Sequence, residues 1–317
     1  MNEVYAVLDI GSASIELLVG EIINSNLHVL FSKKVPSHGV KKGIIEDENL
    51  LVNDIKGVVQ EANDFLDGEI KAVGLTIPTI RSKLYQSNSS VSLSDHDKIS
   101  KDDIVRGLKL STKFKKSHEE EVVCVIPVRF NGDFGISQVP PIGEASRNLI
   151  IDTLIITSQK QILYPYIMAV EKAGLEIMDI CINAFACAKE AFDAVYLQEG
   201  ALIIDMGYKT STISFYKDGY LKYLTVCSVG GYNLTRAIAQ HLQISMNQVK
   251  YGSLDYTVGQ EDIIHTTELP DGRKDYTQKD FAGILEEAAV DMLNVIKEKM
   301  GVIDNGQHYE TLIVGGG

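Results

Sequence analysis

Residues 200–224 read GALIIDMGYKTSTISFYKDGYLKYL and contain two runs of apolar residues. The first run breaks at the letters DMG, which begin at Asp205, and the second is an alternating run. That pattern predicts two strands joined by a tight turn. Residues 4–22, VYAVLDIGSASIELLVGEI, contain the same break at the letters DIG, which begin at Asp9. The sequence therefore contains two copies of one strand-turn-strand motif.

An aspartate at the end of a strand offers a carboxylate to a water-bound Mg²⁺, and a glycine-containing turn offers backbone amides to phosphate oxygens. Gly11 and Gly207 allow a ligand to approach the backbone closely. Two such hairpins that face each other predict a clamp for the phosphates of a nucleotide, with Asp9 and Asp205 near the metal. One such motif alone is more typical of an ordinary turn, so the prediction depends on the pair and on the glycines at 315–317.

Composition sets the class of protein. The chain has 317 residues with 45% apolar character, which favours two lobes. Its net charge of −13 argues against nucleic acid as a partner. The four cysteines form no CxxC pair, which favours a reduced cytoplasmic setting. No signal peptide precedes the first strand, and no apolar run approaches the roughly 20 residues that span a bilayer, so we expect a soluble protein.

Hydrophobic periodicity outlines the first half of the chain. The predicted strands are residues 4–9, 15–23, 26–37 and 71–78, with a helix at 48–66 that carries Leu51, Ile55, Val58, Val59, Ala62 and Phe65 on its apolar face. Residues 84–158 differ in texture and read as a small α+β insertion, with a helix near 102–110 and strands at 120–130 and 148–158. A helix at 160–173, a strand at 174–183 and a helix that buries Phe185, Ala188, Phe192 and Val195 follow.

The second half begins with the second hairpin. A strand then leads to Gly230-Gly231 and a helix from Asn233. A long amphipathic helix is predicted at 279–300, with Phe281, Leu285, Ala288, Met292, Val295 and Met300 on its buried face. The sequence ends in a strand that runs into three glycines.

These features resemble the actin-like ATPase superfamily and, within it, the FtsA family of bacterial cell-division proteins. The matching segments are LDIGSASIELLVGEI and IIDMGYKTSTISFYKDG as two phosphate loops, LIVGGG as an adenosine loop, and LSDHDKISKDDIVRGL and VIPVRFNGDFGI in the insertion, which is the most specific part. The resemblance covers essentially the whole chain. It implies an α/β, actin-like two-lobed ATPase fold with an FtsA-type small α+β insertion subdomain.

The resemblance also implies how the chain is divided. The core of the first lobe is expected at 1–83 with 159–183, the insertion at 84–158, and the core of the second lobe at 184–245 with 301–317, with its outer subdomain at 246–300. The second lobe would be incomplete at its C-terminal end, so we expect the sequence to be truncated.

ATP and Mg²⁺ are the implied cofactors, with Asp9 and Asp205 holding the metal through water. The implied nucleotide-binding residues are Asp9, Gly11, Ser12, Ala13, Ser14, Asp205, Gly207, Tyr208, Lys209, Thr210, Gly230, Gly231, Lys250, Gly315, Gly316 and Gly317. The pair Gly230-Gly231 is either the floor of the cleft or a plain strand-to-helix turn. Lys250 either approaches the nucleoside or is a surface lysine.

The sequence departs from the family pattern at several of these positions. Relatives often carry Lys or Thr at the position of Ser14. They also have a glycine-rich loop where this sequence has Tyr208 and Lys209, although Lys209 could offer a cation to the phosphate oxygens of the nucleotide. Asn183 lies where active relatives place a Glu or Gln that orients the attacking water, or else it is a helix N-cap. Nucleotide binding should therefore survive better than hydrolysis, which predicts at most a slow ATPase.

The implied function is an ATP-binding, actin-like cell-division adaptor that polymerises into filaments and links FtsZ, through its C-terminal peptide, to the membrane. It would act in the cytoplasm at the inner face of the division site, and its membrane contact would require a C-terminal segment that this sequence lacks. A PilM-like adaptor for type IV pilus assembly is one alternative. A small-molecule kinase or phosphatase of the same fold is another, although the sequence offers no convincing catalytic carboxylate besides Asp9 and Asp205.

Overall fold

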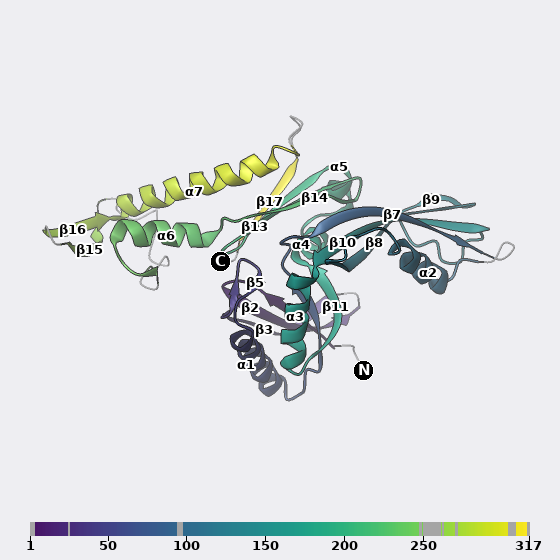
Figure 1. Ribbon diagram of the computed structural model, residues 1–317, viewed down its shortest axis with the longest axis horizontal. Helices are drawn as coiled ribbons and strands as arrows, with labels where there is room; N and C mark the ends of the chain where they lie inside the picture. Colours follow the sequence, from purple (N-terminus) through teal and green to yellow (C-terminus); the bar gives the residue numbers. More distant parts are fainter. Residues whose placement is uncertain are drawn as a thin grey trace.

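The computed structural model describes residues 4–24, 26–93, 98–246, 249, 261, 263–269, 272–303 and 309–315. Figure 1 shows an elongated molecule in which two central sheets lie between smaller parts at either end of the long axis. Both central sheets begin with one of the two hairpins identified above.

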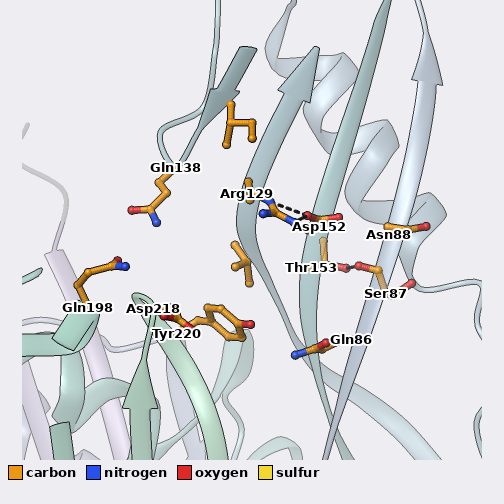
Figure 2. A pocket seen from close by; sticks show the side chains of 12 residues that line it. Gln86, Ser87, Asn88, Arg129, Gln138, Asp152, Thr153, Gln198, Asp218 and Tyr220 are labelled. Atoms are coloured by element: carbon orange, nitrogen blue, oxygen red, sulfur yellow. Dashed lines mark hydrogen bonds and ion pairs between the residues drawn. The ribbon is translucent and has the colours of Figure 1, made fainter. Parts of the chain in front are cut away.

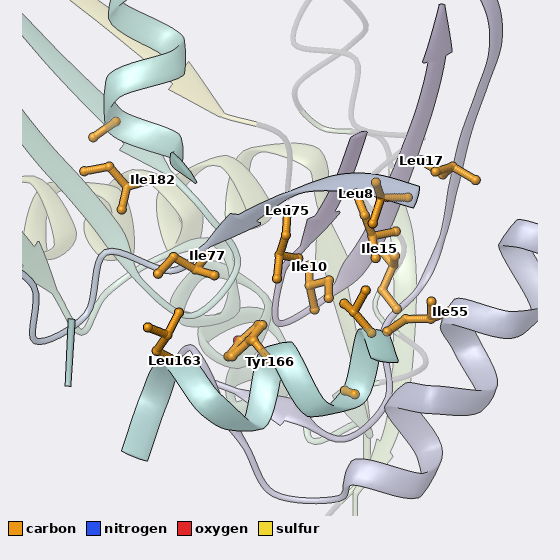
Figure 3. Close-up of a cluster of buried hydrophobic side chains, with 14 of the residues drawn as sticks. Leu8, Ile10, Ile15, Leu17, Ile55, Leu75, Ile77, Leu163, Tyr166 and Ile182 are labelled. Atoms are coloured by element: carbon orange, nitrogen blue, oxygen red, sulfur yellow. The ribbon is translucent and has the colours of Figure 1, made fainter. Parts of the chain in front are cut away.

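The first central sheet has five strands in the order β11-β6-β1-β2-β3. Its strands are β1 (Val4–Ile10), β2 (Ser14–Ile23), β3 (Asn26–Pro36), β6 (Ala72–Ile77) and β11 (Glu176–Ile182). Helices α1 (Glu48–Leu66) and α3 (Lys160–Lys172) pack together on one face. Figure 3 shows Leu8, Ile15, Ile55 and Tyr166 within this core, all fully buried. Alternating apolar residues of the strands thus meet the apolar stripes of two helices.

The insertion follows β6 and is built on a separate antiparallel sheet in the order β7-β10-β8-β9. Its elements are β7 (Lys83–Ser92), α2 (Lys101–Ser111), β8 (Glu120–Gly132), β9 (Gly135–Ser137) and β10 (Asn148–Gln159). Helix α2 begins at a capping box in which Ser100 and Asp103 satisfy each other's backbone amides. It covers one face of the sheet over a small core that includes Val91, Phe130 and Ile151.

Glu120, at the start of β8, is a buried carboxylate that accepts three hydrogen bonds. Its partners are Lys83 Nζ at 2.6 Å, Tyr85 Oη at 2.8 Å and Thr157 Oγ1 at 3.0 Å. The hydrogen bond from Lys83 is the main cause that lowers the pKa of Glu120. This group joins three strands of the insertion.

We expect Glu120→Ala to lower the free energy of unfolding by about 1–3 kcal/mol, because it leaves the buried hydroxyl of Thr157 and the half-buried hydroxyl of Tyr85 without this acceptor. The contribution of Glu120 is fully present above the unfolded-state pKa of about 4.3 and is lost as the pH falls through the lower folded-state pKa. The difference in unfolding free energy between the variant and the parent should therefore become smaller at acidic pH. Urea unfolding at several pH values measures it, and Glu119→Ala, at the exposed neighbouring position, is the control.

The second central sheet has the order β14-β13-β12-β17. Its strands are β12 (Ala201–Met206), β13 (Ser211–Lys217), β14 (Tyr220–Cys227) and β17 (Glu310–Gly315). Helices α6 (Gly231–Leu242) and α7 (Gln278–Met300) extend away from it toward the hairpin of β15 (Ile263–Leu269) and β16 (Gly272–Thr277) (Figure 1).

The two central sheets repeat one arrangement. In each, the first strand pairs antiparallel with the second and parallel with a later strand, as β1 does with β2 and β6 and as β12 does with β13 and β17. Asp9 lies opposite Thr76 of β6, and Asp205 lies opposite Val314 of β17. The duplicated motif in the sequence is therefore a duplicated structural unit.

Three details of the helices differ from expectation. The helix predicted to bury Phe185 through Val195 is two helices, α4 (Asn183–Ala191) and α5 (Ala194–Glu199), because the chain becomes extended at Phe192. Val195 is consequently exposed. Phe65 is also exposed, because the end of α1 lies at the sheet margin, where its ring contacts Phe31 with centroids 5.5 Å apart.

In α7 the prediction that Val295 is buried is wrong, since Ile296 is buried in its place and Val295 faces outward. The helix packs on the second sheet only along part of its length, so its apolar stripe is not buried throughout. The subdomain boundaries given above stay a prediction.

Candidate functional site

Both hairpin turns open into one cavity of about 460 Å³. The predicted site residues that line it are Asp9, Gly11, Ser12, Ala13, Ser14, Asn183, Asp205, Gly207, Tyr208, Lys209, Thr210 and Gly315. They come from the ends of β1, β12 and β17, from the two turns, and from the start of α4. Strand ends and turns distant in the sequence thus converge on one space.

Gly230 and Gly231 have a different place. Neither lines the cavity; they lie behind the second turn, where the amide of Gly231 donates to the carbonyl of Gly207 at 3.0 Å. The amide of Tyr232 likewise donates to the carbonyl of Tyr208 at 2.7 Å. The start of α6 therefore supports the second turn from outside. Lys250, Gly316 and Gly317 lie outside the described residues.

The two turns have the same internal geometry. The amide of Gly11 donates to the carbonyl of Ser14 at 2.8 Å, and the amide of Gly207 donates to the carbonyl of Thr210 at 3.0 Å. Within the described residues, the amides at the turn tips, those of Ser12, Ala13, Tyr208 and Lys209, donate to no backbone carbonyl. Amides in such turns form concavities that bind anions.

Asp9 is held in place from two sides. Its Oδ1 atom accepts hydrogen bonds from Thr76 Oγ1 and, at 3.3 Å, from Asn183 Nδ2. Burial raises the pKa of Asp9, and these two hydrogen bonds only partly oppose that effect. The N-cap interpretation of Asn183 is wrong, because α4 begins at Asn183 itself and its N-cap residue is Ile182. The side chain of Asn183 instead orients a carboxylate of the site.

Asp205 provides the second carboxylate. Burial raises its pKa, and the charge of Asp9 raises it further. Two partly desolvated carboxylates that repel one another across a cavity gain from a divalent cation between them. Oxygen ligands on a partly hydrated ion are what Mg²⁺ prefers. The chemistry of Asp9 and Asp205 therefore fits Mg²⁺.

The second turn is stiffened by aromatic contacts. The rings of Tyr208 and Tyr232 meet edge to face with centroids 5.8 Å apart. Lys209 Nζ lies 5.9 Å from the centre of the first ring and 5.7 Å from the centre of the second. Such cation–π contacts are worth about 0.5–1 kcal/mol at exposed sites. They hold the second turn in one shape although it has few glycines.

Several lining residues were missed by sequence reasoning. They are Lys42, Gly43, Thr76, Thr79 and Cys187, among others. The pairing of β1 with β6 places Thr76 beside Asp9, and only the register of two strands far apart in the sequence shows this. Lys42 lies in the segment GVKKG, residues 39–43, to which the sequence analysis assigned no role.

A larger cavity of about 800 Å³ lies between the insertion and the turn that joins β13 to β14 (Figure 2). Its charged groups are already paired, since Arg129 contacts Asp152 at 2.6 Å and Lys222 contacts Asp218 at 2.7 Å. The residues of the two hairpin turns at Asp9 and Asp205 do not line this cavity. Size alone therefore does not identify the functional site.

Among the described residues, no helix is both long and apolar enough to cross a lipid bilayer. No family model matches the chain. Solved structures nevertheless share its architecture. A chain of the PilM-PilN type IV pilus biogenesis complex aligns with a TM-score of 0.64 at 14% identity, over 99% of this chain and 81% of that one.

EutJ, an ethanolamine utilization protein from Carboxydothermus hydrogenoformans, aligns with a TM-score of 0.58 at 13% identity, over 100% of this chain and 77% of that one. MreB 5 of Spiroplasma citri, bound to AMPPNP, aligns with a TM-score of 0.52 at 11% identity, over 100% of this chain and 85% of that one. The fold is that of the actin-like ATPases, and the predicted fold class is confirmed.

In sequence, the chain is similar to the cell division protein FtsA over most of its length. It is 28% identical to FtsA of Bacillus subtilis (strain 168) over 314 residues, which are 96% of this chain and 71% of that protein. It is 27% identical to FtsA of Staphylococcus epidermidis over 297 residues, which are 91% of this chain and 64% of that protein. The resemblance inferred from the motifs is confirmed.

Proposed function

We propose that the chain binds Mg²⁺-ATP in the cavity between the two hairpin turns. The main support for this proposal is that Asp9, Asp205 and both hairpin turns line one cavity. The two turns also have the same internal hydrogen bond. The tip amides would hold phosphate oxygens, and the two carboxylates would hold Mg²⁺ through water. Gly315 lines the cavity, and the adenosine would rest against it.

We infer that the bound nucleotide stabilises a shape and turns over slowly. Within the described residues, the carboxylates that line the cavity are Asp9, Asp205 and Glu16. The first two face the metal position, and Glu16 is paired with Lys34 at 2.9 Å. Asn183 Nδ2 donates to Asp9 and orients that carboxylate. A neutral amide cannot take a proton from water as a general base does.

At the level of the cell, we propose an actin-like cell-division adaptor. The similarity to FtsA supports this role. The protein would assemble into filaments at the division site and bind the C-terminal peptide of FtsZ through the outer part of the second lobe. It would link FtsZ to the inner face of the membrane.

The deciding experiment pairs a binding measurement with imaging. We expect calorimetry to show ATP binding that needs Mg²⁺, and electron microscopy of the concentrated protein to show filaments with ATP. Phosphate release should stay far below the enzyme median of about 10 per second. Absence of ATP binding would refute the nucleotide site, and rapid turnover would refute the adaptor role.

A PilM-like adaptor is the second candidate, since a chain of the PilM-PilN complex shares the fold with a TM-score of 0.64. A pull-down with immobilised FtsZ C-terminal peptide separates the two candidates. Retention of the protein supports the cell-division role. Retention by a short peptide from a pilus-assembly membrane protein, with none by the FtsZ peptide, would contradict it.

A further inference from the structure

The short ribbon formed by β4 (Val40–Lys41) and β5 (Ile44–Ile45) has a two-residue turn with an unusual first residue. Both turn residues have positive φ, 52° at Lys42 and 74° at Gly43. Two-residue hairpins of this kind favour Asn, Asp or Gly at the first position, because a lysine there brings its Cβ too close to the backbone. A residue that the turn does not favour is a reason to ask what its side chain does.

The turn has a fixed position against the first hairpin. The amide of Gly43 donates to Ser12 Oγ at 3.3 Å. A Cβ atom at Gly43 would lie 2.9 Å from Pro78 Cβ and 3.1 Å from Ile80 Cγ2, so the backbone is fitted closely between its neighbours. Lys42 therefore lines the cavity from a position set by the fold.

The charge of Lys42 has no counterion in the described part of the chain. The adjacent Lys41 contacts Glu46 at 3.4 Å, whereas no ion pair involves Lys42. The other cation at the cavity, Lys209, lies over two tyrosine rings. An unpaired lysine on the wall of a cavity whose turns present free amides is suited to an anionic ligand.

We propose that Lys42 binds the phosphate groups of the nucleotide, which makes the β4–β5 turn a third phosphate-contacting element beside the two hairpin turns. This inference rests on the proposed function. Because the ammonium group meets phosphate oxygens and not the nucleoside, it should favour ATP over adenosine.

Lys42→Asn is the sharpest test, because asparagine suits the positive φ of the turn and removes only the cation. We expect the affinity for Mg²⁺-ATP to fall about tenfold or more, since hydrogen bonds to charged groups contribute about 1.5–3 kcal/mol. The affinity for adenosine should stay unchanged, and the midpoint of thermal unfolding should be equal or higher. Lys41→Asn is the matched control and should change neither affinity by more than about twofold.

The outcomes are distinct. A Lys42→Asn protein that binds ATP as the parent does would overturn the inference, while the proposed function would stand. Equal losses for ATP and adenosine would also overturn it, because they would show that the cavity has changed shape. A parent protein that binds neither ligand would overturn the proposed function together with the role of Lys42.

Discussion

We expect Asp205→Asn to weaken binding of Mg²⁺-ATP by about 10- to 100-fold, the loss typical when a group that orients a metal ion's ligands is removed. The same change should stabilise the ligand-free protein. Asp205 is a partly desolvated carboxylate whose pKa is raised first by burial and then by the charge of Asp9. An amide of the same shape removes that repulsion. It also removes the carboxylate that would hold the water molecules bound to Mg²⁺. Calorimetry and thermal unfolding measure the two effects.

The stabilisation should depend on pH. Because the folded-state pKa of Asp205 is raised, the folded protein holds more protons than the unfolded chain between the unfolded value of about 3.9 and the raised value. The ligand-free parent therefore loses stability as the pH rises through this window. Asp205→Asn lacks this loss, so the difference in unfolding free energy between variant and parent should grow with pH.

Glu16→Gln provides the control, because Glu16 lines the same cavity but is exposed and already contacts Lys34 at 2.9 Å. It should leave the affinity for Mg²⁺-ATP within about threefold of the parent. If Asp205→Asn and Glu16→Gln had equal effects, Asp205 would have no special place at the metal, and the proposed site would be wrong.

The sequence was sufficient for features that depend on local patterns. The break at Asp9 and its copy at Asp205 predicted two hairpins, because alternating apolar residues and a turn glycine specify such a unit locally. The helices α1, α3 and α7 followed from their periodicity in the same way. The convergence of the hairpins on one cavity followed from their duplication.

Individual side-chain contacts between distant segments were not predictable. Thr76 and Asn183 both hydrogen-bond to Asp9, yet they lie 67 and 174 residues from it in the chain. Their roles arise from the parallel pairing of β1 with β6 and from the position of β11 beside β6. The break between α4 and α5 was missed because apolar periodicity continues through Phe192 although the helix does not.

Gly230 lies outside the cavity but determines the backbone position of the second hairpin turn, which lines it. A Cβ atom at this position would lie 2.6 Å from the carbonyl oxygen of Tyr208 and closer still to that of Gly207. Those two carbonyls accept the hydrogen bonds from the start of α6. No flexible side chain is available to move aside, so the backbone of the second turn would have to shift. The sequence suggested either a floor of the cleft or a plain turn, and the structure shows that the start of α6 supports the second hairpin turn.

We therefore expect Gly230→Ala to lower the free energy of unfolding by about 3 kcal/mol, near the upper end of the cost of overpacking. The affinity for Mg²⁺-ATP should fall about 100-fold, since a displacement of about 1 Å costs that much at pre-organised sites. Gly231→Ala is the matched control, because a Cβ there would lie 3.9 Å from Tyr208 Cδ2, an ordinary contact. Its unfolding free energy should stay within about 0.5 kcal/mol of the parent, as for an ordinary surface substitution. Urea unfolding and calorimetry on both variants measure these differences. Equal behaviour of the two variants would show that the second turn does not depend on the backbone of α6, whereas a loss confined to Gly230→Ala ties the phosphate-facing loop to that helix.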